Sequence, residues 1–266
     1  MTRGPLVAPL AESLVSPASV PPVSVPPVGV SPSNASPSSV SPTRPSAGST
    51  PDLFADCAPA APGAPLALAP GAFVLPRLAL ADAPALLDGM HGVLAQAPLR
   101  HWVTPGGLRM SVAMSNCGAL GWVSDRTGYR YDARDPVTGR AWPQMPPALR
   151  ELASRAAAAA GYADFRPDAC LINRYEPGAR LSLHQDRDER DLDQPIVSVS
   201  LGLPAMFVFG GARRSDPTRR VPLCHGDGVV WGGPSRLFHH GVLAVKAGEH
   251  ELTGAVRFNL TFRVAG

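Results

Sequence analysis

The chain has 266 residues, 45% of them hydrophobic, which is enough for one sizeable core and a small appendage. The net charge of +3 and the pI near 8.9 are mildly basic, and only one of the 24 basic residues is a lysine. A GC-rich codon bias would raise the arginine content whatever the function, so this basicity indicates no particular partner. No apolar run reaches the roughly 18 residues that a membrane-spanning helix needs, and prolines interrupt the apolar patches near the N-terminus. We therefore expect a cytoplasmic protein that binds no membrane.

Residues 1–51 differ in composition from the rest of the chain. They are rich in Pro, Ser and Val, almost uncharged, and show neither a helical nor a strand period. Proline removes backbone donors, and too little large apolar surface is present to offset the entropy of ordering the segment. We expect a disordered tail with polyproline II character.

Two later segments, 83–97 and 147–161, have helical periodicity, and the second begins with a proline and ends at Gly161, as helices prefer. The region between them, 100–146, is irregular and rich in glycine and aromatic residues. From residue 168 onward, short apolar segments alternate with turns, which is typical of an antiparallel sandwich or barrel. The predicted strands are 169–175, 179–186, 195–203, 205–211, 228–233, 238–243 and 256–264. The expected fold class is α+β, with the helices outside a β-rich half.

The first candidate for chemistry lies at the end of a predicted strand, in LSLHQD (181–186). Side chains alternate along a strand, so His184 and Asp186 share one face. By themselves, an imidazole and a carboxylate at this spacing are more often a hydrogen-bonded pair than metal ligands. A rival pair, His225 and Asp227, is flanked by glycines and is more typical of a turn leading into the strand VVW. His184 and Asp186 are therefore the preferred pair.

The strand RFNLTFR (257–263) carries two guanidinium groups on one face. Alternation predicts Phe258, Leu260 and Phe262 toward the core, and the polar side chains Arg257, Asn259, Thr261 and Arg263 on the opposite face. On a buried face the two arginines require an anion, because an unpaired buried charge is costly. On an exposed edge strand, water would solvate both instead.

A histidine from FHHGV (238–242) would complete a set of two imidazoles and one carboxylate. Such a facial set leaves positions on Fe(II) open for a cosubstrate and oxygen. The two arginines would then hold a small dicarboxylate through charge-assisted hydrogen bonds. Neighbours on a strand point to opposite faces, so only one of His239 and His240 can be the ligand, and spacing does not decide which.

These residues belong to a series of motifs that resembles the AlkB family of alkylated-nucleic-acid repair dioxygenases, which depend on Fe(II) and 2-oxoglutarate. The motifs run in order from DLFAD (52–56) through VTPGG (103–107), MSVAMSNCG (110–118), NRYEPGARLSLHQDRDE (173–189), PIVSVSLGLPA (195–205) and HGDGVVWGGPSRLFHHGV (225–242) to RFNLTFR (257–263). The resemblance implies a double-stranded β-helix, a jelly-roll relative, with flanking helices. It divides the chain into the tail 1–51, an N-terminal extension with a nucleotide-recognition lid over 52–146, and a dioxygenase core over 147–266.

The resemblance also implies roles for individual residues. His184, Asp186 and His240 match the iron ligands, which selects His240 over His239. The residues that match the 2-oxoglutarate site are Asn173, Arg174, Tyr175, Arg257, Asn259 and Arg263. The residues that match the lid and the substrate contacts are Trp122, Tyr129, Arg130, Tyr131, Asp188 and Arg214. The sequence departs from the family pattern at Leu108. Family members have an aromatic residue at this position, beside the substrate strand.

The implied reaction is oxidative demethylation of bases of the 1-methyladenine and 3-methylcytosine type, in single-stranded DNA by preference and also in RNA, with release of formaldehyde. A base methylated on its pairing edge cannot pair normally, so its extrusion into a pocket is cheap. Trp122 and the His184 imidazole can stack on it. We expect a monomer. Two alternatives stay open: the same iron site acting on tRNA, protein or a small molecule, and a jelly-roll binding module with a structural metal and no turnover.

Overall fold

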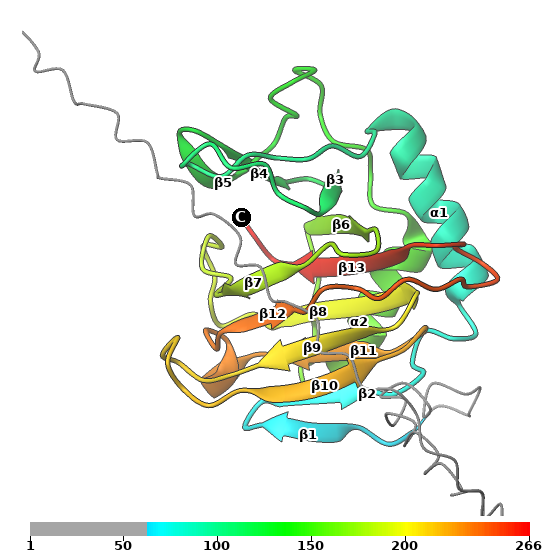
Figure 1. Ribbon diagram of the computed structural model, residues 1–266, viewed down its shortest axis with the longest axis vertical. Helices are drawn as coiled ribbons and strands as arrows, with labels where there is room; N and C mark the ends of the chain where they lie inside the picture. The colour runs from blue at the N-terminus through cyan, green and yellow to red at the C-terminus, as the bar shows by residue number, and fades with distance from the viewer. Residues whose placement is uncertain (1–62) are drawn as a thin grey trace, which may run out of the picture. The chain divides into compact units, whose positions relative to one another are not determined.

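The computed structural model describes residues 63–266 (Figure 1), so the predicted tail lies outside the described residues. The first half of this part contains β1 (Leu66–Ala69), β2 (Ala72–Leu75), α1 (Ala83–Gln96), β3 (Ala113–Gly118), β4 (Gly121–Asp125), β5 (Gly128–Asp132) and α2 (Pro147–Ala159). The second half contains β6 (Ala169–Tyr175), β7 (Leu181–His184), β8 (Ile196–Gly202), β9 (Ala205–Phe209), β10 (Arg219–Leu223), β11 (Gly228–Trp231), a 3-10 turn (Gly233–Ser235), β12 (His240–Val242) and β13 (Arg257–Arg263).

The strands form a large and a small antiparallel sheet. The large sheet has the order β1-β2-β11-β8-β13-β6-β3, and the small sheet has the order β10-β9-β12-β7. From β6 to β13 the chain passes repeatedly between the two sheets, with β6, β8, β11 and β13 in one and β7, β9, β10 and β12 in the other. This alternation is the double-stranded β-helix, and the predicted fold class is confirmed.

Both helices pack against one face of the large sheet. Leu86 and Met90 of α1 and Leu149 and Leu152 of α2 join the cluster that contains Ile172, Phe258, Leu260 and Phe262. A second cluster, with Trp231, Phe207 and Phe209, fills the other side of the sheet. The predicted helix end at Gly161 is confirmed within two residues: Gly161 has a φ of +87°, and the Tyr162 N–H donates to the Ala157 carbonyl at 2.9 Å.

The region predicted as irregular, 100–146, contains three strands, so that prediction is wrong. β3 pairs with β6 at one edge of the large sheet, and β4 and β5 form a separate two-stranded hairpin. β10 was also missed, because Pro222 and two arginines obscure its alternation. Among residues 63–266, no helix has the length and apolar content needed to cross a bilayer.

The rival pair His225 and Asp227 lies in a turn, as predicted. The Asp227 N–H donates to the Cys224 carbonyl at 3.1 Å, and the Asp227 carboxylate accepts the N–H groups of Cys224 and Arg77. His225 Nδ1 accepts the Gly202 N–H at 2.9 Å. The side chains of this pair therefore accept hydrogen bonds from the backbone and stabilise the turn, rather than binding a ligand.

Candidate active site

Two histidines from neighbouring strands of the small sheet meet at the end of that sheet. His184 is the last residue of β7, His240 is the first of β12, and the two are directly paired in the antiparallel register. Paired residues share a face, and the ring centroids lie 4.4 Å apart. His239 points elsewhere, with Nδ1 3.2 Å from the Gly211 carbonyl.

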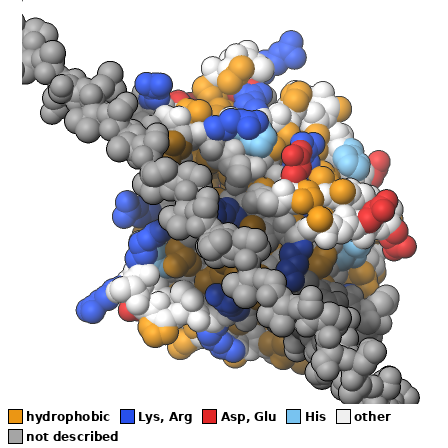
Figure 2. All heavy atoms as spheres, in the orientation of Figure 1, with side chains coloured by type: hydrophobic (Ala, Val, Ile, Leu, Met, Phe, Trp, Pro, Cys, Tyr) orange, Lys and Arg blue, Asp and Glu red, His pale blue; other side chains and the backbone are white. Residues whose placement is uncertain are grey.

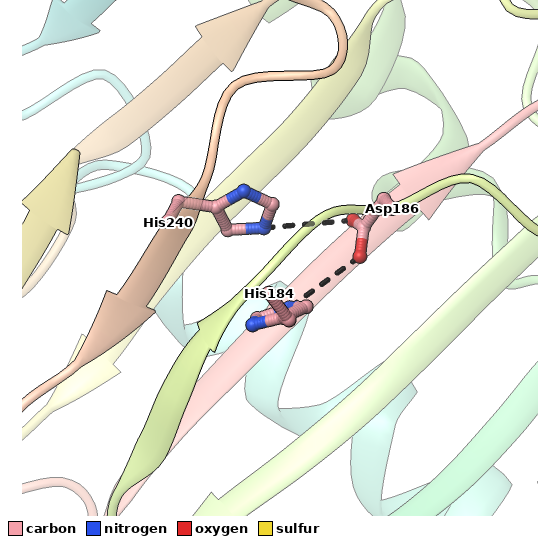
Figure 3. A group of neighbouring side chains, drawn as sticks. All are labelled: His184, Asp186 and His240. Carbon is pink, nitrogen blue, oxygen red and sulfur yellow. Dashed lines mark ion pairs between the residues drawn. The ribbon is translucent and has the colours of Figure 1, made fainter. Parts of the chain in front are cut away.

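Asp186, two residues beyond β7, turns its carboxylate toward both imidazoles (Figure 3). Its Oδ1 is 3.4 Å from His184 Nε2, and its Oδ2 is 3.8 Å from His240 Nε2. One ligand atom of each residue lies within 4.8 Å of the others. These distances fit a single metal ion held by two nitrogens and one oxygen on one side.

Hydrogen bonds at the far side of each ring prepare both imidazoles for metal binding. His184 Nδ1 is 2.9 Å from the Ser182 carbonyl, and His240 Nδ1 is 3.0 Å from the Phe238 carbonyl. A carbonyl only accepts, so Nδ1 carries the proton and the Nε2 lone pair faces Asp186. Burial and the neighbouring His184 lower the pKa of His240 to about 3, so the ring is neutral, as a metal ligand must be.

The Asp186 carboxylate is ionised. Burial would raise its pKa, but the charge of Arg263, and after it the neighbouring His184, bring the pKa well below the ordinary value. Arg263 Nη2 donates to Oδ2 at 2.6 Å and Nε at 3.1 Å. Arg263 therefore hydrogen-bonds to Oδ2, while Oδ1 lies on the side of the imidazoles.

The strand that carries the two arginines is central rather than exposed. β13 lies between β8 and β6 in the large sheet, and Arg257 and Arg263 are 1% and 6% exposed. The solvated-edge alternative is therefore wrong, and the buried guanidinium groups require partners inside the protein.

Arg257 lacks such a partner on most of its donors. Its Nη2 donates to the Ser200 hydroxyl at 3.0 Å, and the guanidinium carbon lies 4.9 Å from the centre of the Tyr175 ring. Nε and Nη1 have no hydrogen-bond partner within the described part of the chain, and burial lowers the Arg257 pKa. A bound carboxylate would satisfy both the charge and the free donors.

The neighbouring polar groups of the large sheet face the same side. Register pairs Tyr175 with Arg257 and Asn173 with Asn259, and Asn173 Nδ2 donates to Asn259 Oδ1 at 3.3 Å. The Asn173 Oδ1 atom has no partner among the described residues. Arg174 does not join this group: it is paired with Phe258 on the other face, and its guanidinium contacts Glu176 at 2.7 Å.

The hairpin β4–β5 is the segment predicted as a lid. Trp122 stacks on Tyr129 with ring centroids 5.6 Å apart, and its indole N–H donates to Asp188 at 2.9 Å. Arg130 is ion-paired with Asp125 within the hairpin at 2.9 Å. The Tyr131 hydroxyl points inward and donates to Glu189 at 2.7 Å. Trp122, Tyr129 and Asp188 therefore meet at the hairpin, whereas Tyr131 reaches the protein interior.

Arg214 lies beside the metal-ligand strand. It is exposed in the loop between β9 and β10 and donates through Nη1 to the carbonyl of Leu183, the residue before His184. Leu108 is 73% exposed, in a turn closed by its N–H donating to the Thr104 hydroxyl at 3.1 Å.

Three residues of the site were missed from the sequence. Asn116 fixes the hairpin by accepting the Trp122 N–H and donating to its carbonyl, each at 3.0 Å. Glu189 and Arg236 form a buried ion pair at 3.0 Å beside Arg263. Glu189 stands in the charged run DRDER, which is typical of a solvated loop, and no local signal distinguishes it from its neighbours.

Comparison with known proteins agrees with this geometry. Residues 71–263 match the model of the 2OG-Fe(II) oxygenase superfamily. The chain belongs to this family. It is 61% identical over 214 residues to the alpha-ketoglutarate-dependent dioxygenase AlkB of Salmonella typhimurium, covering 80% of this chain and 97% of the relative. Identity to the protein of that name from Escherichia coli is 59% over 215 residues, covering 81% and 98%. The solved structure of OsALKBH1 superposes with a TM-score of 0.66 at 26% identity, covering 75% of this chain and 99% of that one.

The protein is therefore an Fe(II)- and 2-oxoglutarate-dependent dioxygenase. Its residues fit both groups: the set His184, Asp186 and His240 suits Fe(II), and the uncompensated Arg257 suits one carboxylate of a diacid. The alternative of a binding module with a structural metal is excluded at the level of the family.

Proposed function

We propose that this dioxygenase removes methyl groups from ring nitrogens of alkylated bases, of the 1-methyladenine and 3-methylcytosine type, in single-stranded DNA by preference and also in RNA. The observation that carries the proposal is the meeting of three metal-ligand atoms within 4.8 Å beside a buried guanidinium with two unpartnered donors. The resemblance to AlkB proteins supplies the substrate class.

We assign the roles as follows. His184, Asp186 and His240 hold the iron, and Arg257, Arg263, Asn173, Tyr175 and Asn259 orient the cosubstrate. When bound, iron and 2-oxoglutarate supply the oxidation: oxygen is consumed, the diacid becomes succinate and carbon dioxide, and one oxygen atom enters a methyl C–H bond. The hydroxymethyl group left on the base nitrogen then breaks down to formaldehyde and the repaired base. Arg174 has no place in this scheme, because it faces away.

The hairpin and its surroundings would recognise the base. The stacked rings of Trp122 and Tyr129 offer an aromatic surface, and the Asp188 carboxylate held by the Trp122 indole would favour a cationic methylated base. The loop between β9 and β10 and the start of β10 add four exposed arginines: Arg213 and Arg214 in the loop, and Arg219 and Arg220 in the strand. Figure 2 shows that basic side chains gather on the side of this face where that loop lies, whereas acidic side chains gather on the opposite side. Such a loop suits contacts to phosphates.

We also propose that the protein is a cytoplasmic monomer, divided into a tail (1–51), an extension with the lid (52–146) and a dioxygenase core (147–266). β1, β2 and β3 of the extension complete the large sheet of the core, so the last two parts fold together.

The test measures formaldehyde and succinate from singly methylated oligonucleotides, with Fe(II), 2-oxoglutarate and ascorbate present. We expect both products in equal amounts from the native chain and neither from His184→Ala. A panel of DNA, RNA and tRNA substrates, with a methylated peptide, decides between this proposal and the alternative substrates. Iron-loaded protein that turns over 2-oxoglutarate on none of the nucleic acids would refute the substrate class.

A further inference from the structure

Glu189 is enclosed between two arginines and a tyrosine of the β4–β5 hairpin. Its side chain is 2% exposed. Oε2 accepts from Arg236 Nη2 at 3.0 Å, and Oε1 accepts the Tyr131 hydroxyl at 2.7 Å and lies 3.2 Å from Arg263 Nε. A buried carboxylate is tolerated only with such partners, so these contacts define where Glu189 can lie.

Arg263 is consequently held from two sides. Asp186, three residues before Glu189 in the same loop, accepts from Nη2 and Nε at 2.6 and 3.1 Å, while Glu189 lies against Nε. The orientation of this guanidinium is thus set by the protein before any cosubstrate arrives, which is the purpose of preorganisation.

Arg236 gives Glu189 a fixed support. Besides the ion pair, Arg236 Nη1 donates to the Asp186 carbonyl at 2.6 Å and Nε donates to the Gln194 carbonyl at 2.9 Å, with a side chain only 4% exposed. Tyr131, by contrast, belongs to a hairpin that pairs with neither main sheet. Glu189 therefore joins Arg236 and Arg263 on one side to a hairpin outside both main sheets on the other.

We propose that Glu189 is a positioning residue that couples the β4–β5 hairpin to Arg263, so that binding of the cosubstrate carboxylate and ordering of the hairpin reinforce one another. The inference rests on the proposed role of Arg263 in holding 2-oxoglutarate. Coupling between two sites is reciprocal: if the hairpin contact tightens the cosubstrate site by some factor, the cosubstrate orders the hairpin by the same factor.

The chain offers a matched pair of variants. Tyr131→Phe removes only the hydroxyl that donates to Glu189, whereas Tyr129→Phe removes a hydroxyl from the same strand that has no hydrogen bond in the described part of the chain and leaves the ring on Trp122. Glu189→Gln removes the charge but keeps an acceptor. Because this last variant leaves Arg236 without its counter-ion, its melting temperature is measured first.

Two measurements are made with Mn(II) in place of Fe(II), so that no turnover occurs. The first is the 2-oxoglutarate dissociation constant, by titration calorimetry. The second is amide hydrogen exchange of residues 121–132, with and without 2-oxoglutarate. In the native chain and in Tyr129→Phe we expect 2-oxoglutarate to slow exchange of the hairpin. In Tyr131→Phe we expect roughly tenfold weaker binding and an equal loss of the added protection, since the lost hydrogen bond is to a charged group. Glu189→Gln should weaken both further.

The outcomes distinguish a failure of the proposed coupling from a failure of the cosubstrate assignment. The coupling would be overturned if Tyr131→Phe kept the native dissociation constant and the native gain in protection. It would also be overturned if hairpin exchange in Tyr131→Phe were faster than in the native chain by the same factor with and without 2-oxoglutarate. A native chain that binds 2-oxoglutarate and releases formaldehyde, but shows no gain in protection, would overturn the coupling alone. A native chain that fails to bind 2-oxoglutarate would overturn the cosubstrate assignment itself.

Discussion

Replacing Arg257 with methionine tests whether the buried guanidinium exists for the cosubstrate. The variant removes a charge that is 1% exposed and has one hydrogen bond, to Ser200 at 3.0 Å. Methionine is close in length and fills irregular space well. The protein then loses an uncompensated charge and leaves one serine hydroxyl without its donor.

The substitution should preserve or raise the stability of the protein without 2-oxoglutarate, but should weaken the binding of 2-oxoglutarate. Without it, substituting an apolar side chain for buried charge is neutral or stabilising by about 1–4 kcal/mol, and the unpaired serine costs about 1 kcal/mol. The variant should therefore be as stable as the native chain, or more stable by up to about 3 kcal/mol. With it, the loss of a buried charge contact should weaken binding by about 2–5 kcal/mol, or roughly 30- to 4000-fold.

Thermal unfolding with and without 2-oxoglutarate, in the presence of Mn(II), measures both effects. At a concentration of 100 times the dissociation constant the native chain should gain about 2.7 kcal/mol, which for about 200 ordered residues raises the melting temperature by about 5–11 °C. Arg257→Met should show at most about a third of that rise at the same concentration. Arg155→Met, which removes an exposed arginine paired with Asp82, is the control and should keep the full rise. A variant that melts well below the native chain without 2-oxoglutarate, yet binds it normally, would refute the reasoning.

Three further predictions concern other parts of the molecule. Leu108→Tyr adds an aromatic ring at a position 73% exposed and should tighten binding of single-stranded oligonucleotides by about 1–3 kcal/mol in a fluorescence titration, with no effect on 2-oxoglutarate affinity. Gly241→Ala places a Cβ 2.6 Å from the Leu181 carbonyl, so it should spread β12 from β7, separate the two histidine ligands, and lower both Mn(II) affinity and stability, the latter by about 1–3 kcal/mol; unchanged metal affinity would contradict this. Burial and the neighbouring His250 lower the pKa of His225 from 6.5 to about 4. The unfolded chain therefore binds this proton more readily, and about 1–2 kcal/mol of stability, after allowance for solvent screening of this half-buried ring, should be lost as the pH falls from 6.5 toward 4. In His225→Asn, the free energy of unfolding measured by urea denaturation should fall less steeply over this pH range. A pH profile identical to that of the native chain would contradict this assignment to His225.

The strands that carry the site were predictable because their signal is local. β6 and β13 lie within one residue of their predicted limits, since β13 alternates apolar and polar residues and β6 is a short, mainly apolar segment bounded by turns. The same alternation predicts that Arg257 and Arg263 share a face with each other, and that His184 shares one with Asp186. It also implies that Arg174 lies on the opposite face to Asn173, so the inclusion of Arg174 among the cosubstrate contacts followed the resemblance alone.

The parts that escaped prediction depend on contacts between distant segments. β3 is ordered by pairing with β6, which lies more than fifty residues later, and the hairpin is held by Asn116 and Asp188 from two other segments. Glu189 resembles its charged neighbours in sequence and differs only because Arg236 and Arg263 enclose it. Burial that arises from contacts between distant segments produces no periodic pattern of apolar residues in the local sequence.

The most direct test of the central claim is an anaerobic titration of the Fe(II)-loaded protein with 2-oxoglutarate, followed by visible absorption. A 2-oxo acid bound to Fe(II) gives a charge-transfer band, and we expect this band to saturate at one equivalent in the native chain. His240→Ala should show no band, and Arg257→Met should need far more 2-oxoglutarate to reach it. A native protein without the band, or an unchanged band after loss of His240, would contradict an iron site built from His184, Asp186 and His240.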